Sequence, residues 1–144
     1  MLFTVSLLGS LGNIPSSYRW RSQLSQFTML VLDDEEDRIV HFRSRFPHAD
    51  LRWVDNVPEC IESLGQAWDV IRLDHDLGGE VFVNSARADS GMEVVRYIVN
   101  NQPEHLRETV FIVHSRHERA AIKMVEELQA AGYDCTYMPF SWQD

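Results

Sequence analysis

Short apolar runs that suit buried strands alternate with segments of helical periodicity along most of this sequence of 144 residues. The predicted strands are residues 28–32, 51–54, 69–73, 109–113 and 134–138. Such an alternation is typical of a parallel sheet with helices on both faces, because each parallel connection needs a crossover. The carboxyl ends of parallel strands lie at one edge of the sheet, and ligands bind there. We therefore look for functional residues directly after the strands.

The segments between the strands carry apolar side chains at helical spacing and end at helix-terminating residues. The predicted helices are residues 35–46, 57–65, 92–101 and 120–132. Residues 1–27 do not fit the alternation. Their apolar start has no basic residue before it, which is a poor fit to a secretory signal. A short helix capped by Ser16 or Ser17 is predicted to run to Phe27. We interpret residues 1–27 as an N-terminal extension and residues 28–144 as one domain.

Carboxylates follow the first and third predicted strands. Asp33 and Asp34 end the first run. Asp74 and Asp76 flank His75 after the third. If these strands are neighbours the four acids converge, and such close carboxylates raise one another's pKa unless a cation neutralises them. Because oxygen ligands of this kind suit Mg²⁺ or Mn²⁺, the sequence predicts a metal site at this edge. The alternative is that these acids only cap helices.

The composition narrows the classes of ligand. The net charge is −9, which argues against broad nucleic-acid binding and leaves room for a small anion held by a metal and arginines. No apolar run has the roughly 18 residues that a membrane span needs, so no membrane association is predicted. Cys60 and Cys135 lack metal-ligand spacing, and we interpret them as buried free thiols in a reducing cytosol. A cytoplasmic protein is therefore expected.

Over about residues 28–140 the sequence resembles a response-regulator receiver domain. Asp33 and Asp34 stand where receivers carry their metal-binding acid pair, and Asp74 matches the phosphoacceptor. Gly91 matches the glycine that opens the third helix of receivers. The resemblance implies an α/β fold of the flavodoxin type, a doubly wound, five-stranded parallel sheet in the order 2-1-3-4-5.

Three features depart from the receiver pattern. Receivers carry Lys before the final Pro, where this sequence has Met138, and a thioether cannot neutralise a phosphoryl oxygen. They carry Thr or Ser at the end of the fourth strand, where this sequence has His114. The sequence also ends without the usual fifth helix, which leaves apolar strand surface beside the first helix. We expect residues 1–27 to cover that surface, through Leu7, Leu8 and Leu24 among others; the alternative is a homodimer with twofold symmetry.

These departures resemble a narrower family, the cyclic-phosphate-processing receiver domains. The resemblance lies in the Asp-His-Asp-Leu-Gly string at residues 74–78 and the His-Ser pair at residues 114–115. This sequence differs by placing two extra acids before Arg38 and by having His117 where an amide is expected. The resemblance implies a cyclic phosphate as the substrate.

Opening a cyclic phosphodiester requires a water nucleophile, a proton donor for the leaving alkoxide, and positive charge near the non-bridging oxygens. The predicted site comprises the metal ligands Asp33, Asp34, Asp74 and Asp76, the catalytic residues His114, His75 and Asp74, and the substrate-binding residues Arg38, Ser115, Arg116 and His117. We expect His114 to matter more than His75, because it replaces the hydroxyl that faces the phosphoryl pocket in receivers. Zinc is not expected, since the His114 and His117 pair has no third His or Cys nearby in sequence.

The predicted function is therefore that of a metal-dependent phosphoesterase acting on a small or nucleotide-terminal cyclic phosphate. Its partner would be a small phosphorylated ligand or the cyclic-phosphate end of a nucleic acid, bound by a monomer or a homodimer. Two alternatives stay open. One is a signalling receiver that is phosphorylated on Asp74, against which Met138 and His114 count. The other is a non-catalytic receiver-like module that binds a ligand or a protein.

Overall fold

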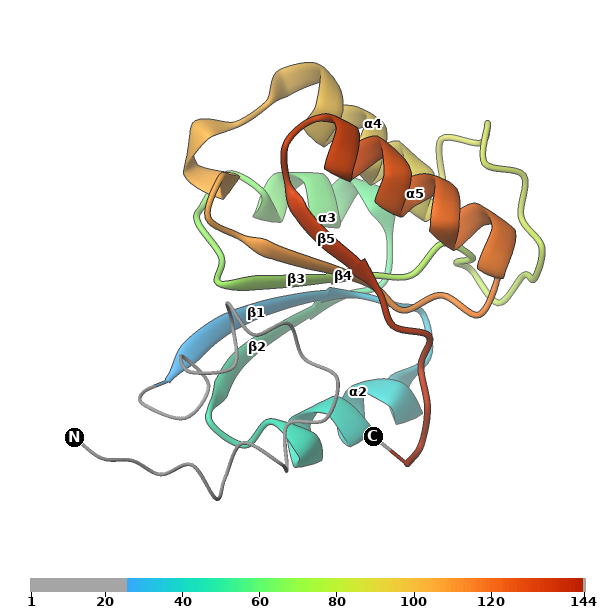
Figure 1. The fold of residues 1–144 in the computed structure, drawn as a ribbon. Coiled ribbons are helices and arrows are strands. Elements are labelled where there is room, and N and C mark those ends of the chain that lie inside the picture. Colours follow the sequence, from blue (N-terminus) through green and yellow to red (C-terminus); the bar gives the residue numbers. More distant parts are fainter. Residues whose placement is uncertain (1–25, 144) are drawn as a thin grey trace.

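The structure, a computed structural model, describes residues 26–143 as a five-stranded parallel sheet with helices on both faces (Figure 1). The strands are β1 (Phe27–Leu32), β2 (Ala49–Val54), β3 (Val70–Leu73), β4 (Val110–Val113) and β5 (Asp134–Tyr137). The helices are α2 (Glu36–Arg45), α3 (Val57–Ser63), α4 (Gly91–Asn101), the short 3₁₀ helix η2 (Glu104–Leu106) and α5 (Glu118–Ala130). The order β2-β1-β3-β4-β5 confirms the predicted fold, and no helix follows β5 within the described residues.

The register of the sheet brings the ends of three strands to one level. Leu32 of β1 pairs with Leu73 of β3, which in turn pairs with Val113 of β4. The backbone pairing continues one residue further, because Asp74 N donates to Leu32 O and His114 N donates to Leu73 O, each over 3.0 Å. The polar residues that follow these strands therefore leave the sheet side by side, as the sequence predicts.

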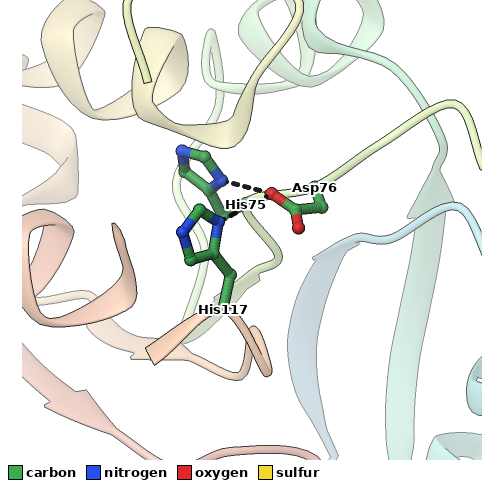
Figure 2. A group of neighbouring side chains, drawn as sticks. All are labelled: His75, Asp76 and His117. Atoms are coloured by element: carbon green, nitrogen blue, oxygen red, sulfur yellow. Dashed lines mark hydrogen bonds and ion pairs between the residues drawn. The ribbon is translucent and has the colours of Figure 1, made fainter. Parts of the chain in front are cut away.

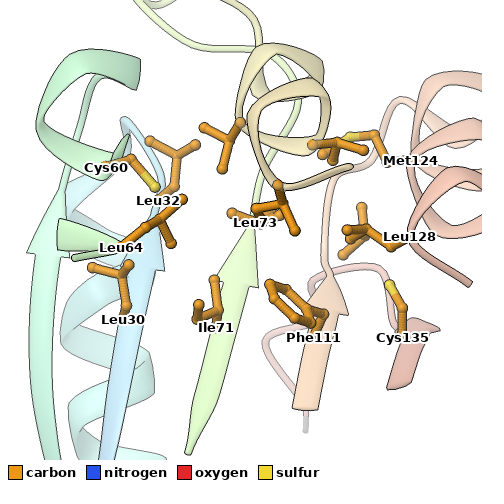
Figure 3. Packing of buried hydrophobic residues seen from close by; sticks show 14 of the residues in the cluster. Leu30, Leu32, Cys60, Leu64, Ile71, Leu73, Phe111, Met124, Leu128 and Cys135 are labelled. Atoms are coloured by element: carbon orange, nitrogen blue, oxygen red, sulfur yellow. The ribbon is translucent and has the colours of Figure 1, made fainter. Parts of the chain in front are cut away.

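Helices α3, α4 and α5 cover one face of the sheet (Figures 1 and 3). The buried residues labelled in Figure 3 are Leu30, Leu32, Cys60, Leu64, Ile71, Leu73, Phe111, Met124, Leu128 and Cys135. Both cysteines are buried and free, as predicted. This contiguous apolar layer holds the strand ends rigidly in place, because burial of apolar surface is the main favourable term in folding.

Helix α4 begins directly against the end of β3. Gly91 N donates to His75 O over 2.8 Å, and a Cβ added to Gly91 would lie only 1.9 Å from Asp74 O. No other residue therefore fits at this position without moving the backbone. The glycine lets α4 approach the strand end that carries the candidate site.

The opposite face of the sheet packs against α2 and against the segment that follows β5. Met138 and Phe140 contact this smaller apolar cluster. The ring of Phe140 lies 5.5 Å from that of Phe42 on α2 and 4.7 Å from that of Trp142. Figure 1 shows this C-terminal segment passing beside α2. It provides a cover for the apolar surface beside α2 that the sequence analysis did not anticipate.

The predicted cover is not tested, because residues 1–25 lie outside the described part of the chain. Its alternative, a homodimer, is not tested by the structure of a single chain. The predicted N-terminal helix also falls there, except for its last two residues. Phe27 belongs to β1, where it pairs with Ala49, so that helix cannot extend to Phe27. Between residues 26 and 143, every helix is too short or too polar for a bilayer-spanning segment.

Candidate functional site

A cleft of about 640 Å³ opens at the carboxyl edge of the sheet, where the loops after β1, β2, β3 and β4 meet. The lining residues with polar or charged side chains are Asp34, Glu35, Arg38, Asp55, Asp74, Asp76, Glu80, Ser115, Arg116 and His117. Ligand binding at this edge is the general expectation for open parallel sheets. The cleft combines carboxylates that suit a cation with arginines that suit an anion.

The residue that directly follows each of β1, β3 and β4 points to the same side of the sheet, because side chains alternate in direction along a strand. Leu32, Leu73 and Val113 belong to the core beneath α3, α4 and α5, so the next residue of each strand turns toward α2. These next residues form what we call the inner cluster, in which the possible ligand atoms all lie within 4.8 Å of one another. The inner cluster consists of Asp33, Asp74 and His114.

Arg38 of α2 lies against both carboxylates of the inner cluster. Its Nη1 is 3.2 Å from Asp33 Oδ2 and 3.4 Å from Asp74 Oδ2, and its Nη2 is 2.8 Å from Glu35 Oε1. Burial raises the pKa of Asp74 to about 6; the charge of Asp33 adds to this, while His114 and Arg38 oppose it. Burial thus favours the protonated form of Asp74 even with Arg38 beside it.

His114 supports the inner cluster from behind and does not line the cleft. Its side chain is fully buried, its ring lies edge-on to Phe42 at 5.4 Å, and its Nε2 is 2.7 Å from Asp33 Oδ2. Burial tends to raise the pKa of Asp33, but the hydrogen bond to His114 and the charges of His114 and Arg38 lower it overall. The structure therefore gives His114 the position of a residue that holds Asp33 as a carboxylate.

A second group of side chains, the outer cluster, consists of His75, Asp76 and His117. Figure 2 shows one ring nitrogen of each histidine turned toward the same carboxylate oxygen. His75 Nδ1 lies 2.6 Å and His117 Nδ1 lies 3.1 Å from Asp76 Oδ1. Burial raises the pKa of Asp76, but the hydrogen bonds from both histidines outweigh it and lower this pKa. His75 is fully buried, whereas His117 lines the cleft.

The loop after β3 is tied to the strand ends through its backbone. Gly79 N donates to Asp34 Oδ2 and Phe82 N donates to Asp76 Oδ2, each over 2.6 Å. Gly79 adopts a φ of 77°, a left-handed conformation that glycine tolerates well, and Phe82 adopts a φ of 55°. The predicted part-ordered flap is thus a loop held at its base, with the side chains of Val81 and Phe82 exposed.

The structure divides the four predicted metal-binding acids instead of joining them. Asp33 and Asp74 share the inner cluster, Asp76 belongs to the outer cluster, and Asp34 contacts the loop. All four predicted substrate-binding residues line the cleft: Arg38, Ser115, Arg116 and His117.

Two further residues of the site were not predicted from the sequence. Glu35 forms an ion pair with Arg38, and Asp55 lines the cleft from the end of β2. A signal existed for Asp55, because it too follows a predicted strand. The spacing of Glu35 three residues before Arg38 is also that of an ion pair on one helical face.

The oxygen atoms of the inner cluster suit a hard divalent cation such as Mg²⁺ or Mn²⁺. Burial is the main cause of the raised pKa of Asp74, and a cation bound to its carboxylate would oppose that shift by favouring the charged form. Asp34 lines the same cleft and offers a further carboxylate on that side. Arg38 contacts both Asp33 and Asp74, so its guanidinium would have to move before an ion could contact the two carboxylates together.

Comparison with solved structures supports the receiver fold. A response regulator from Burkholderia pseudomallei, with a phosphorylated aspartic acid, a calcium ion and citrate, is 17% identical and has a TM-score of 0.57; the match covers 82% of this chain and 63% of that one. The receiver domain of a sensor histidine kinase from Pseudomonas aeruginosa, with magnesium in its active-site cleft, is 17% identical and has a TM-score of 0.51. This match covers 83% of the present chain and 90% of that domain. This chain therefore spans less than two thirds of the Burkholderia protein. Identities this low show a common fold alone.

Comparison with protein families is more specific. No curated protein sequence matches the chain. The sequence profile of the cyclic-phosphate processing receiver domain matches residues 28–130, a stretch that includes β1 to α5 and both clusters. Since this match covers well over half of the sequence, the chain belongs to the cyclic-phosphate processing receiver domain family.

Proposed function

We propose that this protein is a divalent-metal-dependent phosphoesterase that opens a cyclic phosphate, carried by a small molecule or by the end of a nucleic acid. One observation carries the proposal: a single cleft holds two arginines and a carboxylate-oriented imidazole beside a buried carboxylate pair. The substrate class in the family's name agrees with this combination.

The two arginines provide the anion-binding part of the site. Arg116 is exposed on the cleft wall and forms no ion pair with any described residue, so its guanidinium is available to a ligand. Arg38 is held in place by Glu35 and by the inner cluster. A guanidinium can bind two phosphate oxygens at once, which fixes the phosphate in one orientation.

His117 is the imidazole of the cleft that can transfer a proton. Its Nδ1 contacts Asp76 Oδ1, which fixes the ring and leaves Nε2 without a hydrogen bond to any described residue. A ring oriented by a carboxylate in this way is a recurring device in acid–base catalysis. His114 and His75, the histidines that the sequence suggested for this task, are both fully buried. We therefore assign proton transfer to His117 and the positioning of Asp33 to His114.

The proposed Mg²⁺ or Mn²⁺ would be held by Asp33 and Asp74, with Asp34 nearby, and would supply positive charge at the non-bridging phosphate oxygens. The cleft residues then bind and orient the phosphate, and His117 moves the proton. The loop after β3 forms one wall of the cleft through Gly79 and Val81, which limits the access of water on that side.

The proposal is tested by incubating the full chain with a panel of cyclic phosphates in Mg²⁺, Mn²⁺ or EDTA and measuring monoester formation. We expect turnover with metal and none with EDTA. His117→Ala should slow turnover by at least about tenfold, the lower end of what loss of an acid–base group costs. The exposed residues His48 and Arg119 do not line the cleft. His48→Ala is therefore the matched control for His117→Ala, and Arg119→Ala is the matched control for Arg116→Ala.

Two results would contradict the proposal. Binding of cyclic phosphates by the wild type without turnover would identify a non-catalytic module. Equal turnover by the wild type and His117→Ala would remove the assigned proton-transfer group.

A second candidate function is that of a signalling receiver phosphorylated on Asp74. The observation in its favour is the position of Arg38, whose Nη1 lies 3.4 Å from Asp74 Oδ2 and can replace the cation that Met138 does not supply. Incubation with beryllofluoride or a small phosphodonor separates the two functions. Stable modification of Asp74 together with a change in assembly would favour the receiver function over the esterase.

A further inference from the structure

We propose that His75, Asp76 and His117 form a binding site for a transition-metal ion with nitrogen ligands, best suited to Zn²⁺. This site is separate from the oxygen-rich inner cluster. It goes beyond the proposed function, because it requires neither turnover nor a phosphate ligand. Zinc was not predicted from the sequence, because the His114 and His117 pair has no third His or Cys nearby along the chain. The fold instead brings His117 together with His75 and Asp76.

The geometry of the outer cluster matches a set of metal ligands. The possible ligand atoms lie within 4.8 Å of one another, and both Nδ1 atoms face Asp76 Oδ1, at 2.6 and 3.1 Å (Figure 2). In a tetrahedral site, Zn–N and Zn–O bonds of about 2.0–2.1 Å place neighbouring ligand atoms roughly 3.3–3.4 Å apart. Both contacts to Asp76 Oδ1 would therefore lengthen on metal binding, that of His75 more than that of His117. Two imidazoles and one carboxylate favour zinc and related metals over Mg²⁺, which prefers oxygen alone.

The residues around the cluster already orient its ligands. His75 Nε2 lies 2.8 Å from Ser85 Oγ, so Nε2 can carry the ring proton and donate to Ser85. In that tautomer the lone pair of Nδ1, which now contacts Asp76, would be available to a metal ion. Asp76 is fixed by the backbone N–H groups of Phe82 and Val83. Such outer partners fix the tautomer and the ring plane of metal-binding histidines, and they are a regular part of zinc sites.

The cluster also has an open side. Asp76 and His117 line the cleft together with Arg116, while His75 closes the inner side from a fully buried position. Three protein ligands beside an open position are the pattern of catalytic or exchangeable zinc rather than of closed structural sites. Metal on Nδ1 of His117 would leave the ring proton on Nε2, so metal binding and the base role of His117 are alternatives at this residue.

The test is a metal titration of the full chain after treatment with a chelator, with Zn²⁺ followed by calorimetry and thermal unfolding, and with Co²⁺ followed by visible absorption. We expect one equivalent of each metal to bind, with a Co²⁺ spectrum that indicates nitrogen ligands. His117→Ala should weaken Zn²⁺ binding by at least about tenfold, since the loss of a residue that only hydrogen-bonds a metal ligand already costs about 10- to 100-fold in affinity. His117 is partly exposed, so this variant should fold; Asp76→Asn is the conservative second variant.

The controls separate this site from others on the chain. His48→Ala removes an exposed histidine away from the cluster and should leave the affinity for Zn²⁺ unchanged. Asp74→Asn alters the inner cluster and should also leave it unchanged, which distinguishes this site from the proposed Mg²⁺ or Mn²⁺ site. The proposal is overturned if wild type fails to bind Zn²⁺, or if His117→Ala binds it as tightly as wild type.

Discussion

The inner and outer clusters contain the same kinds of side chain, yet only the outer cluster presents a histidine to the cleft. In the inner cluster Asp33 and His114 are fully buried and Arg38 shields the carboxylates. In the outer cluster His117 reaches the cleft and Asp76 is partly exposed. A buried histidine beside a buried carboxylate mainly sets the charge of its neighbour, whereas a histidine at a cleft can meet a ligand. The position of an imidazole relative to the cleft therefore decides its role here, more than its place in a motif.

The largest expected effect is on stability and belongs to the inner cluster. His114→Ala leaves Asp33 without its 2.7 Å partner and opens a cavity beside Phe42, so we expect a loss of about 3 kcal/mol in the free energy of unfolding. His117→Ala should cost less than about 1 kcal/mol, because that side chain lies at the surface of the cleft. Denaturation with urea measures both. If both variants lost the same free energy of unfolding, the two histidines would not differ in their contribution to stability.

Asp74→Asn should make the metal-free protein more stable at pH 8. Burial raises the pKa of Asp74 from its ordinary value of 3.8 to about 6 in the folded protein. Folding therefore binds protons, and wild-type stability falls as pH rises from about 4 to 6. Each pKa unit corresponds to about 1.4 kcal/mol; after subtracting the lost contact with Arg38, we expect a gain of about 1–2 kcal/mol. The gain should disappear below pH 4. A variant that is less stable at pH 8 would show that Arg38 fully compensates the charge.

Phe140→Ala tests whether the C-terminal segment supports the inner cluster. Phe140 packs on Phe42 and lies 5.5 Å from the Arg38 guanidinium. Because its ring is only half-buried, we expect a loss of about 1–2 kcal/mol, below the range for a fully buried Phe. Urea denaturation again provides the measurement, and the control is Val40→Ala, which removes an exposed side chain from α2, the helix that Phe140 packs against. An unchanged midpoint would mean that the segment after β5 is not part of the folded core.

The smallest expected effect concerns the support of the outer cluster. Ser85→Ala removes the hydroxyl 2.8 Å from His75 Nε2, and the loss of one such hydrogen bond costs about 1 kcal/mol. The affinity for Zn²⁺ should fall along with stability if Ser85 orients a metal-binding ring. A loss of stability with unchanged affinity would restrict Ser85 to a structural role.

The fold, and the edge of the sheet that carries the candidate site, could both be predicted from the amino-acid sequence. Short, continuous apolar runs, which are almost wholly buried in β1, β3 and β4, and helical segments between them specify a parallel sheet. The residues after Leu32, Leu73 and Val113 therefore had to meet at one edge. The alternation of side chains along β4 also implies that His114 points toward α2, because Val113, the residue before it, faces the other side of the sheet. These features are local, so short-range pattern is enough to recognise them.

The tertiary structure alone decided how the site residues are distributed. Asp76 left the acid cluster because the loop after β3 bends back and its N–H groups bind that carboxylate. His117, and not His114, reached the cleft because the chain turns between β4 and α5, at Ser115 Oγ, which accepts from His117 N. The segment with Phe140 covers α2 through contacts that span about a hundred residues of sequence. Such outcomes depend on long-range packing and on loop backbone geometry, which no residue pattern along the chain encodes locally.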